Sequence, residues 1–415
     1  MRGAAATSKH PDRGEHRAKR HGKRRRKALL VAAIGLAVLL TPLVLSEVWF
    51  RWKTFDSLGP WQLGGAVREG VEDEYCQYDP LLGWRGKPNF EGLHYRANLP
   101  PTPLSLNSKG WRDRERSVRL ADGRKRILLL GDSFGMGLGV PFEQAVACLL
   151  EKETRAEVVN LSMNGYSTDQ ELLVLEKEGL TYQPDVVVLL FYWNDVPNNV
   201  FPVTFMGYTK PCFTLDAQGN LVLQYRPGHH GAATPGFRHS LARWFRNHSE
   251  LYRRLWVRGR MAAVRAGKAP PVSPFDYAGP KAGRIALSPD AQGMDRNAIV
   301  ILGKLLRKID EHSRSIGAKT LIVVIPMADQ VRRLAADTDR VDYDLLPPGA
   351  MMRAFARQTG IPTLMLLPAL REAERLKPTS FPKEFHWTPA GHRAAAKAIA
   401  DELRRRKWMQ RNDER

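Results

Sequence analysis

Apolar positions along this chain form one long run near the N-terminus and several short runs further on. The long run covers residues 28–46, which carry no charged side chain. A helix of this length is long enough to cross the ~30 Å hydrocarbon core of a bilayer. Trp49, Phe50 and Trp52 follow the run, as aromatic residues do at a membrane interface. The pattern therefore predicts one N-terminal transmembrane helix at residues 28–46.

The segment before this run, residues 1–27, is strongly basic. It holds eleven lysines and arginines, two acidic residues and no aromatic residue, a composition typical of a disordered tail. An arm that binds nucleic acid is one interpretation. The apolar run that follows favours another, because basic segments beside a membrane helix stay in the cytoplasm. We therefore expect no nucleic-acid partner, and a single-pass protein of the plasma (inner) membrane whose body is extracytoplasmic (periplasmic).

A cleaved signal peptide is the alternative to an anchor, since Val44 and Ser46 weakly fit a cleavage site. The apolar region would be long for a signal peptide, and the charged region before it very long. The anchor is therefore the favoured interpretation, and both interpretations export the body of the protein.

The short apolar runs are rich in leucine and β-branched residues, and most are followed by turn residues and then by helical periodicity. They begin at Arg126, Val158, Asp185, Lys319 and Ile361. Near-continuous apolar strands that alternate with helices indicate a parallel sheet covered on both faces. We therefore predict a doubly wound, flavodoxin-like α/β domain at residues 124–405, closed by a helix from Pro389 to Arg405.

The remaining segments differ from this domain in composition. Residues 47–123 are rich in glycine, proline and charge, and we expect a juxtamembrane stalk and a cover segment packed on the domain. Residues 406–415 form a short tail. Residues 197–293 make a long insertion between the third and fourth strands, with a hairpin expected at its Gln218-Gly219-Asn220 turn.

The second half of this insertion has a helical apolar face surrounded by arginines. The face comprises Leu241, Trp244, Phe245, Leu251, Tyr252, Leu255 and Trp256. Long connections at this edge of a sheet usually carry function. The segment could form a lid, lie on the membrane, or pack on the domain, and the last is the favoured interpretation.

The chain has three cysteines and a formal net charge of +21, and neither changes the predicted architecture. Cys148 lies in a helical pattern and is expected in the core. Cys76 and Cys212 could pair in an oxidising compartment, although their separation in sequence cannot show it. The chain has no CxxC motif and no cluster of histidines and cysteines, so we predict no metal and no cofactor.

Residues that could take part in catalysis or ligand binding directly follow the predicted strands. They are Gly131-Asp132-Ser133 after the first strand, Asn164-Gly165 after the second, Asn194-Asp195 after the third, and Glu384-Phe385-His386 in a late loop after the fifth. Ligands of such sheets bind beyond the carboxyl ends of the strands. The sequence therefore predicts one site built from these four stretches.

The residue types at these positions suit acyl transfer. A serine hydroxyl needs a base to become a nucleophile, and His386 is the candidate base for Ser133. Glu384 could hold the imidazole in the required tautomer. The backbone N–H groups of Ser133 and Gly165, with the side-chain amide of Asn194, would bind the developing oxyanion. Taken singly, each residue also has an ordinary structural explanation, such as a helix cap or a turn.

The set GDS at 131–133, Gly165, Asn194 and His386 resembles, in order and approximate spacing, the four positions that name the SGNH/GDSL hydrolase family. The surrounding sequences, NLSMNGYSTDQ and FHWTPAGHRAAA, are similar to those of a membrane-anchored bacterial branch of this family. The resemblance covers residues 105–405. It implies Ser133 as nucleophile, His386 as base, and Gly165 and Asn194 in the oxyanion hole.

Two positions depart from the family pattern. Many members carry the acid three residues before the histidine, where this chain has Lys383. A branch with an acid-x-His-Trp arrangement has the acid at the position of Glu384, although aspartate is usual there. The family often has glycine two residues before the asparagine, where this chain has Tyr192.

The sequence therefore predicts a serine esterase or acyl hydrolase outside the cytoplasm. Its expected substrates are acyl esters, such as O-acetyl esters, of a glycan, an envelope polymer or a lipid, cleaved through an acyl-enzyme. One alternative is an O-acyltransferase that uses the same site. The other is a non-catalytic envelope-assembly protein that binds polymer.

Overall fold

The computed structural model describes most of the chain. Described are residues 13–58, 75–94, 99, 102–120, 123–200, 210–224, 294–336, 347–382 and 384–410, and six positions between 241 and 255. Of the apolar face expected in the insertion, Trp244 and Trp256 lie outside the described residues.

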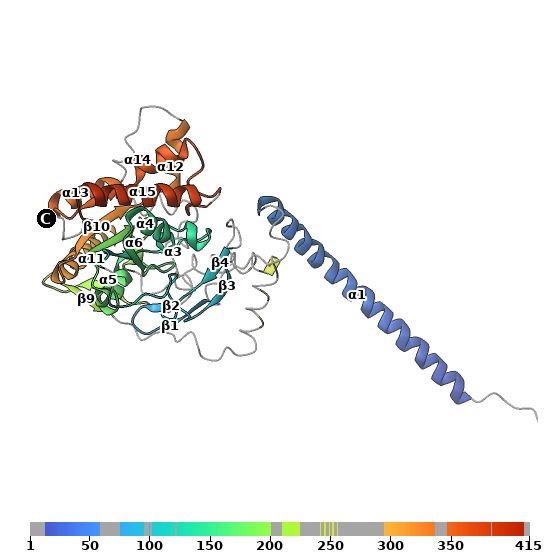
Figure 1. Cartoon of the computed structure of the whole chain (residues 1–415). Coiled ribbons are helices and arrows are strands. Elements are labelled where there is room, and N and C mark those ends of the chain that lie inside the picture. Colours follow the sequence, from blue (N-terminus) through green and yellow to red (C-terminus); the bar gives the residue numbers. More distant parts are fainter. Residues whose placement is uncertain are drawn as a thin grey trace, which may run out of the picture.

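A single long helix, α1 (Arg13–Leu58), precedes the globular part of the molecule (Figure 1). The helix begins inside the basic segment that we expected to be disordered. Lysine, arginine and alanine are good helix formers, and a helix already nucleated by the apolar run extends easily. Its stretch Arg26–Trp49 has a mean hydropathy of 2.7, and none of its most apolar window is buried against protein.

Five parallel strands form the central sheet, in the order β11-β10-β7-β5-β6. The strands are β5 (Arg126–Leu130), β6 (Glu157–Asn160), β7 (Val186–Phe191), β10 (Lys319–Val324) and β11 (Thr363–Met365). Numbered along the chain this order is 2-1-3-4-5, the flavodoxin-like order. The predicted doubly wound α/β fold is confirmed. The chain order reverses between β5 and β7, which makes the ends of these strands the expected ligand site.

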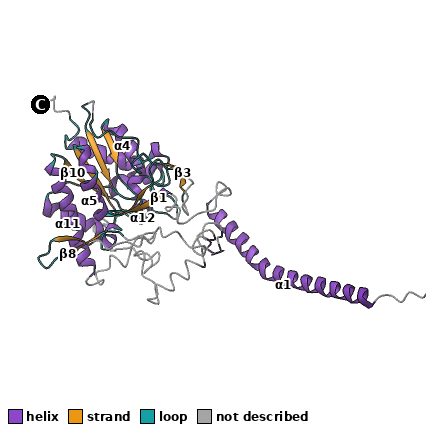
Figure 2. Ribbon diagram, turned by 90° about the horizontal axis from the view of Figure 1, so that it is seen from below, coloured by secondary structure: helices purple, strands orange, loops and turns teal. Residues whose placement is uncertain are grey.

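Alternate side chains of each strand enter two separate hydrophobic cores, one on each face of the sheet. In β5, for example, Leu128 and Leu130 face one core, and Ile127 and Leu129 face the other. The first core is closed by α5 (Thr168–Lys177), α11 (Met294–Ser315) and α13 (Pro347–Thr359). The second is closed by α4 (Val146–Thr154), α12 (Ala328–Ala336), α14 (Leu367–Glu374) and α15 (Pro389–Arg405). Of these helices, α4, α5, α11 and α12 are labelled in Figure 2. The predicted closing helix is α15, with the expected bounds. Short helical turns complete the domain: α3 (Ser133–Met136), α6 (Asp195–Asn198), η2 (Phe142–Gln144) and η3 (Gly179–Tyr182).

Residues 75–120 add two small antiparallel sheets beside the first core. They are β1 (Cys76–Asp79) with β2 (Gly83–Gly86), and β3 (Glu91–His94) with β4 (Thr102–Ser105). Trp84 and Trp111 from this segment are almost fully buried, and both stack edge-on against Tyr166 of the main domain. We call residues 75–120 the cover segment.

The insertion begins with the expected hairpin, β8 (Cys212–Leu215) and β9 (Leu221–Gln224). Its turn contains Gly219 at φ 80°, a conformation that favours glycine. All three cysteines are buried thiols, so the pairing of Cys76 with Cys212 that the sequence left open is not formed.

Candidate active site

Ser133 stands at the tip of the turn that joins β5 to α3. The Asp132 carboxylate accepts a hydrogen bond from the Phe134 backbone N–H at 2.9 Å and so begins α3. Gly137, at φ 79°, ends this helix after one turn. A Cβ at Gly135 would collide with the Ser162 hydroxyl on the neighbouring loop. Glycines thus allow the tight turn that presents the Ser133 hydroxyl.

The structure brings His386 to this serine from a loop more than 250 residues later. His386 Nε2 lies 2.7 Å from Ser133 Oγ, and His386 Nδ1 lies 2.9 Å from Glu384 Oε1. Only 5% of Ser133 and 1% of His386 are exposed. With a proton on Nδ1 held by Glu384, Nε2 is free to accept the proton of the serine. Glu384 therefore occupies the geometric position of a triad acid, and Lys383 lies outside the described residues.

The loop that carries His386 and Glu384 is fixed at several points. Arg332 from α12 donates to the backbone oxygens of Phe381 (2.6 Å) and Glu384 (2.9 Å). The Phe381 N–H donates to the His386 carbonyl at 3.0 Å. Directly after the loop, Thr388 caps α15. These contacts fix the loop on both sides of the imidazole.

Aromatic rings surround the imidazole. Phe385 lies 4.4 Å from it and Phe134 5.2 Å, measured between ring centroids. Tyr192, which stands where the family often has glycine, stacks on Phe385 at 5.8 Å with an interplanar angle of 16°. Its ring therefore belongs to the wall of the site and displaces none of the polar residues.

Gly165 and Asn194 lie at the ends of the two strands that flank β5. Gly165 follows β6 in a turn at φ 79°, and Asn194 follows β7 just before α6. The Trp84 indole N–H of the cover segment donates to the Asn164 carbonyl at 3.1 Å and fixes the first of these turns. Both residues thus stand at the same edge of the sheet as Ser133.

Sequence reasoning missed Arg112, which braces the turn of the nucleophile from the cover segment. Its guanidinium donates to four backbone oxygens, those of Met136 (3.1 Å), Gly137 (2.5 Å), Val140 (2.8 Å) and Pro103 (3.1 Å). Burial lowers the pKa of Arg112 to about 10, so the side chain keeps its charge at neutral pH. Because carbonyls that point inward need donors, Arg112 replaces the hydrogen bonds that the short α3 cannot supply.

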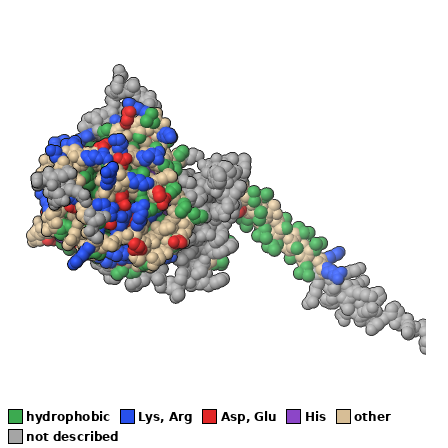
Figure 3. All heavy atoms as spheres, in the orientation of Figure 1, with side chains coloured by type: hydrophobic (Ala, Val, Ile, Leu, Met, Phe, Trp, Pro, Cys, Tyr) green, Lys and Arg blue, Asp and Glu red, His purple; other side chains and the backbone are tan. Residues whose placement is uncertain are grey.

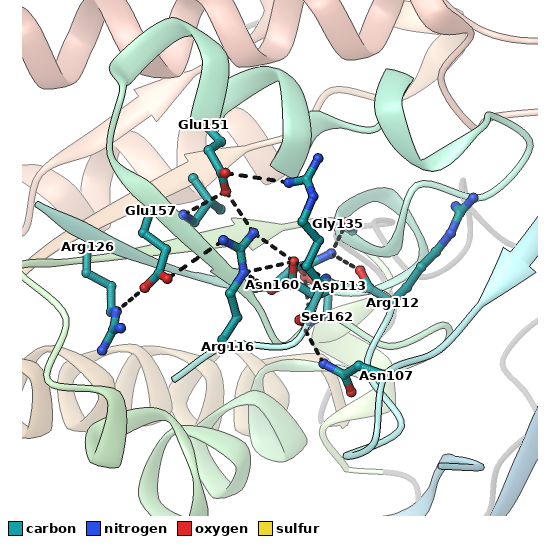
Figure 4. A network of polar contacts seen from close by, with 12 residues as sticks. Asn107, Arg112, Asp113, Arg116, Arg126, Gly135, Glu151, Glu157, Asn160 and Ser162 are labelled. Carbon is teal, nitrogen blue, oxygen red and sulfur yellow. Dashed lines mark hydrogen bonds and ion pairs between the residues drawn. The ribbon is translucent and has the colours of Figure 1, made fainter. Parts of the chain in front are cut away.

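A polar network continues from Arg112 toward the far end of β5 (Figure 4). Asp113 accepts from Arg116 and from the Asn160 backbone N–H, and Asn160 Nδ2 donates to the Gly135 carbonyl at 3.1 Å. Arg116 also bonds Glu151 of α4 at 2.7 Å. The cover segment is therefore tied to α4, β6 and the turn of the nucleophile at once.

A buried acidic cluster behind the site was also not foreseen. Glu171 and Asp195 are at most 1% exposed, and burial, followed by the charges of neighbouring carboxylates, raises the pKa of both well above ordinary values. Asp195 accepts from the Thr168 hydroxyl (3.3 Å) and the Tyr192 N–H (3.4 Å). It thereby joins the turn of Asn194 to the start of α5. The third carboxylate, Asp169, pairs with Lys210 from the insertion.

His392 is buried in α15 beside the site and accepts a hydrogen bond from the Val146 N–H at 3.2 Å through Nδ1. Burial, with the charges of Arg112 and His386, lowers the pKa of His392 from 6.5 to about 3. Between these values the unfolded chain binds a proton that the folded protein rejects. This histidine therefore removes stability as the pH falls through that range, by about 1.4 kcal/mol per pH unit at most.

We expect the variant His392→Asn to lose this pH dependence, because its side chain can accept from Val146 and takes up no proton. Urea unfolding of both proteins at several pH values between about 3.5 and 7 measures the difference. The difference in free energy of unfolding between the wild type and the variant should change steadily as the pH falls below about 6.5. A constant gap over the whole range would contradict the assignment of a neutral buried imidazole.

Comparison with known proteins identifies the family of this chain. A model of the GDSL-like lipase/acylhydrolase family matches residues 129–394, well over half of the chain. The chain belongs to this family. As a GDSL-family protein it is a hydrolase that acts on esters, and the matched range contains the end of β5, Ser133 and the loop of His386.

Solved structures resemble this GDSL-family chain only distantly. They include one described as TesA (14% identity, 68% of this chain and 99% of that chain covered, TM-score 0.35), an acetyl xylan esterase, AlAXEase (13%, 67% and 99%, 0.36), and the lipase/acylhydrolase from Enterococcus faecalis (14%, 68% and 96%, 0.32). No curated protein matches the chain. At these distances the likenesses carry no information on substrate.

Proposed function

We propose that this GDSL-family hydrolase is a membrane-anchored serine esterase whose catalytic groups are Ser133, His386 and Glu384, with Gly165 and Asn194 in the oxyanion hole. The observation that carries the proposal is the chain of two short contacts, Ser133 Oγ to His386 Nε2 at 2.7 Å and His386 Nδ1 to Glu384 Oε1 at 2.9 Å. This is the arrangement in which an imidazole can take the proton of a hydroxyl nucleophile.

In the proposed reaction Ser133 Oγ attacks the ester carbonyl while His386 Nε2 takes its proton. The negative oxygen of the tetrahedral intermediate is bound by the backbone N–H groups of Ser133 and Gly165 and by the amide of Asn194. His386 then gives its proton to the leaving alcohol, and an acyl-enzyme forms. Water, activated by the same imidazole, attacks the acyl group, and the second intermediate collapses to release the acid and Ser133.

The variant Asn194→Ala should lower kcat by roughly 10²–10³, because it removes one oxyanion donor. Substrate affinity should change little, since the interaction forms mainly in the transition state. Steady-state kinetics on p-nitrophenyl acetate, with circular dichroism as a check of folding, measures both. An unchanged kcat would remove Asn194 from the oxyanion hole.

Glu384→Gln should lower kcat by roughly 10⁴, because an amide at that position can stabilise the wrong imidazole tautomer and cannot balance the imidazolium. Glu372, an exposed carboxylate of α14, offers a matched control, and Glu372→Gln should leave kcat unchanged. If Glu384→Gln retained wild-type activity, the acid of this site would have to be sought elsewhere.

The proposed location is outside the cytoplasm, with residues 28–46 as an anchor in the plasma (inner) membrane and the basic residues 1–27 inside. The candidate span Arg26–Trp49 contains the uncharged run 28–46, which is longer than the roughly 7–15 residues of a signal peptide's apolar region. Figure 3 shows mostly hydrophobic side chains along this helix, between lysines and arginines at its outer end and the globular part, and residues 28–46 carry no charge. Pro42 lies inside this helix, as prolines in membrane helices commonly do.

We further propose that residues 47–123 link the anchor to the hydrolase domain at 124–405 and brace it, that the insertion at 197–293 interrupts this domain, and that 406–415 is a tail. The proposed substrates are acyl esters, O-acetyl esters among them, of a glycan, an envelope polymer or a lipid. An acyl-enzyme is common to hydrolysis and to transfer; only the attacking group, water or a sugar hydroxyl, differs.

The test uses the full-length protein in detergent with p-nitrophenyl acetate, first alone and then with a soluble oligosaccharide as acyl acceptor. Release of acetate in step with p-nitrophenol supports an esterase. Acetylated oligosaccharide formed at the expense of acetate would show a transferase instead. No p-nitrophenol above the rate of buffer would overturn the catalytic proposal and favour a protein that binds polymer.

A further inference from the structure

Glu47 of α1 contacts the insertion through its side-chain carboxylate. Glu47 Oε2 accepts hydrogen bonds from the Ser249 hydroxyl and the Leu251 N–H, both at 2.9 Å. Ser249 Oγ in turn accepts from the Tyr252 N–H at 3.1 Å. A negative charge at the first N–H groups of a helical turn is favourable. The contact therefore holds the part of the insertion around Ser249 beside α1 (Figure 1, yellow near the blue helix).

This contact sets the depth of the insertion relative to any bilayer around α1. Glu47 directly follows the uncharged residues 28–46 and precedes Trp49, which is 48% exposed. In a spanning helix these two residues lie at the boundary between hydrocarbon and headgroups. A group that hydrogen-bonds to Glu47 must lie within a few ångströms of the same boundary, so Leu251 and Ser249 are placed there as well.

Large apolar side chains of this part of the insertion face outward. Leu241, Phe245 and Leu255 are 42%, 40% and 56% exposed. Leu241 and Phe245 are four residues apart, as are Leu251 and Leu255, the spacing that places side chains on one face of a helix. At the edge of a bilayer, the free energy falls when such side chains are buried at the boundary between the headgroups and the acyl chains.

The charge of the same stretch favours one kind of lipid surface. Between residues 238 and 260 the sequence has seven arginines and a single acidic residue, Glu250. Basic residues near a membrane are attracted to anionic headgroups by about 1 kcal/mol each. Apolar residues combined with arginines are typical of segments that lie in the plane of the interface.

We propose that the segment around Leu241, Phe245 and Leu255 docks on the anionic lipid surface beside α1, with Glu47 holding it at that depth. The inference rests on the proposed membrane anchor. It deepens that proposal, because a second contact with the bilayer restricts how the hydrolase domain can turn above the membrane.

The test places a fluorescent probe on a single introduced cysteine of the full-length protein in nanodiscs that contain nitroxide-labelled lipid. The three native cysteines are buried and should react slowly. Probes are placed by Leu255→Cys, by Leu40→Cys inside the apolar stretch, and by Leu376→Cys, an apolar residue of the hydrolase domain that is 83% exposed. Each position is measured with phosphatidylglycerol present and with phosphatidylcholine alone.

We expect quenching at residues 40 and 255 and none at 376, with quenching at 255 weaker by roughly twofold or more without the anionic lipid. Glu47→Gln should reduce quenching at 255 and leave that at 40 unchanged. A quenched probe at 40 with an unquenched one at 255 would overturn docking and leave the anchor standing. Absence of quenching at both would overturn the anchor itself. A probe at 255 that is blue-shifted but unquenched would mean that protein covers this face, which contradicts the proposal. Equal quenching in both lipids would show that the anionic headgroups do not attract the segment, which also contradicts it.

Discussion

Replacing Ser133 with alanine should lower kcat for ester hydrolysis by roughly 10⁶ and abolish covalent labelling by a fluorophosphonate. The estimate follows from serine hydrolases, in which loss of the nucleophile removes most of the rate enhancement. The fold should persist, because the turn is formed by the Asp132 side chain and by glycines, and the Ser133 hydroxyl is bonded to His386. Labelling of the purified full-length protein, followed by gel fluorescence, measures the loss directly.

The matched control for this variant is Ser117→Ala, which changes an exposed serine outside the site. The control should label like the wild type. Labelling that survives in Ser133→Ala would show that another residue is the nucleophile. A wild-type protein that neither labels nor hydrolyses esters would point to the polymer-binding alternative.

Replacing His386 with alanine should be almost as damaging, also by roughly 10⁶ in kcat, because the hydroxyl then has no base within reach. The 2.7 Å contact of Nε2 with Ser133 Oγ is the physical reason. Since the two residues act on one proton, the double variant Ser133→Ala/His386→Ala should be no slower than either single variant. Kinetics of the three variants on one ester measures this directly.

His312→Ala is the matched control, because His312 is half-buried in α11 and pairs there with Glu176 at 2.8 Å. It should keep wild-type kcat. Losses in the double variant that equal the product of the single losses would show that the two residues act independently. Such a result would contradict the proposed proton transfer.

The arrangement of the site also suggests why this hydrolase carries its cover segment. Arg112 holds the carbonyls of α3, and Trp84 holds the turn of Gly165, so two walls of the site depend on residues 75–120. A domain beginning at residue 124 would leave the carbonyls of Met136 and Gly137 without these donors. The hydrolase domain and the cover segment therefore form one functional unit.

Much of the fold follows from patterns that are local in sequence. Each strand is a run of apolar residues long enough to be recognised alone, and the parallel arrangement follows because such runs alternate with helices. The order of the chain then places Ser133, Gly165 and Asn194 after successive strands. For these residues the sequence predicts position well, because a strand end is a property of a few consecutive residues.

Other features depend on distances between segments that no local pattern contains. The support of α3 by Arg112 and the acidic cluster of Asp169, Glu171 and Asp195 arise only when remote segments meet. The sequence by itself determined the strands, their alternation with helices and the candidate serine and histidine. The tertiary structure decided which polar atoms share a buried space, because hydrogen bonds and desolvation act over a few ångströms and follow packing, not order along the chain.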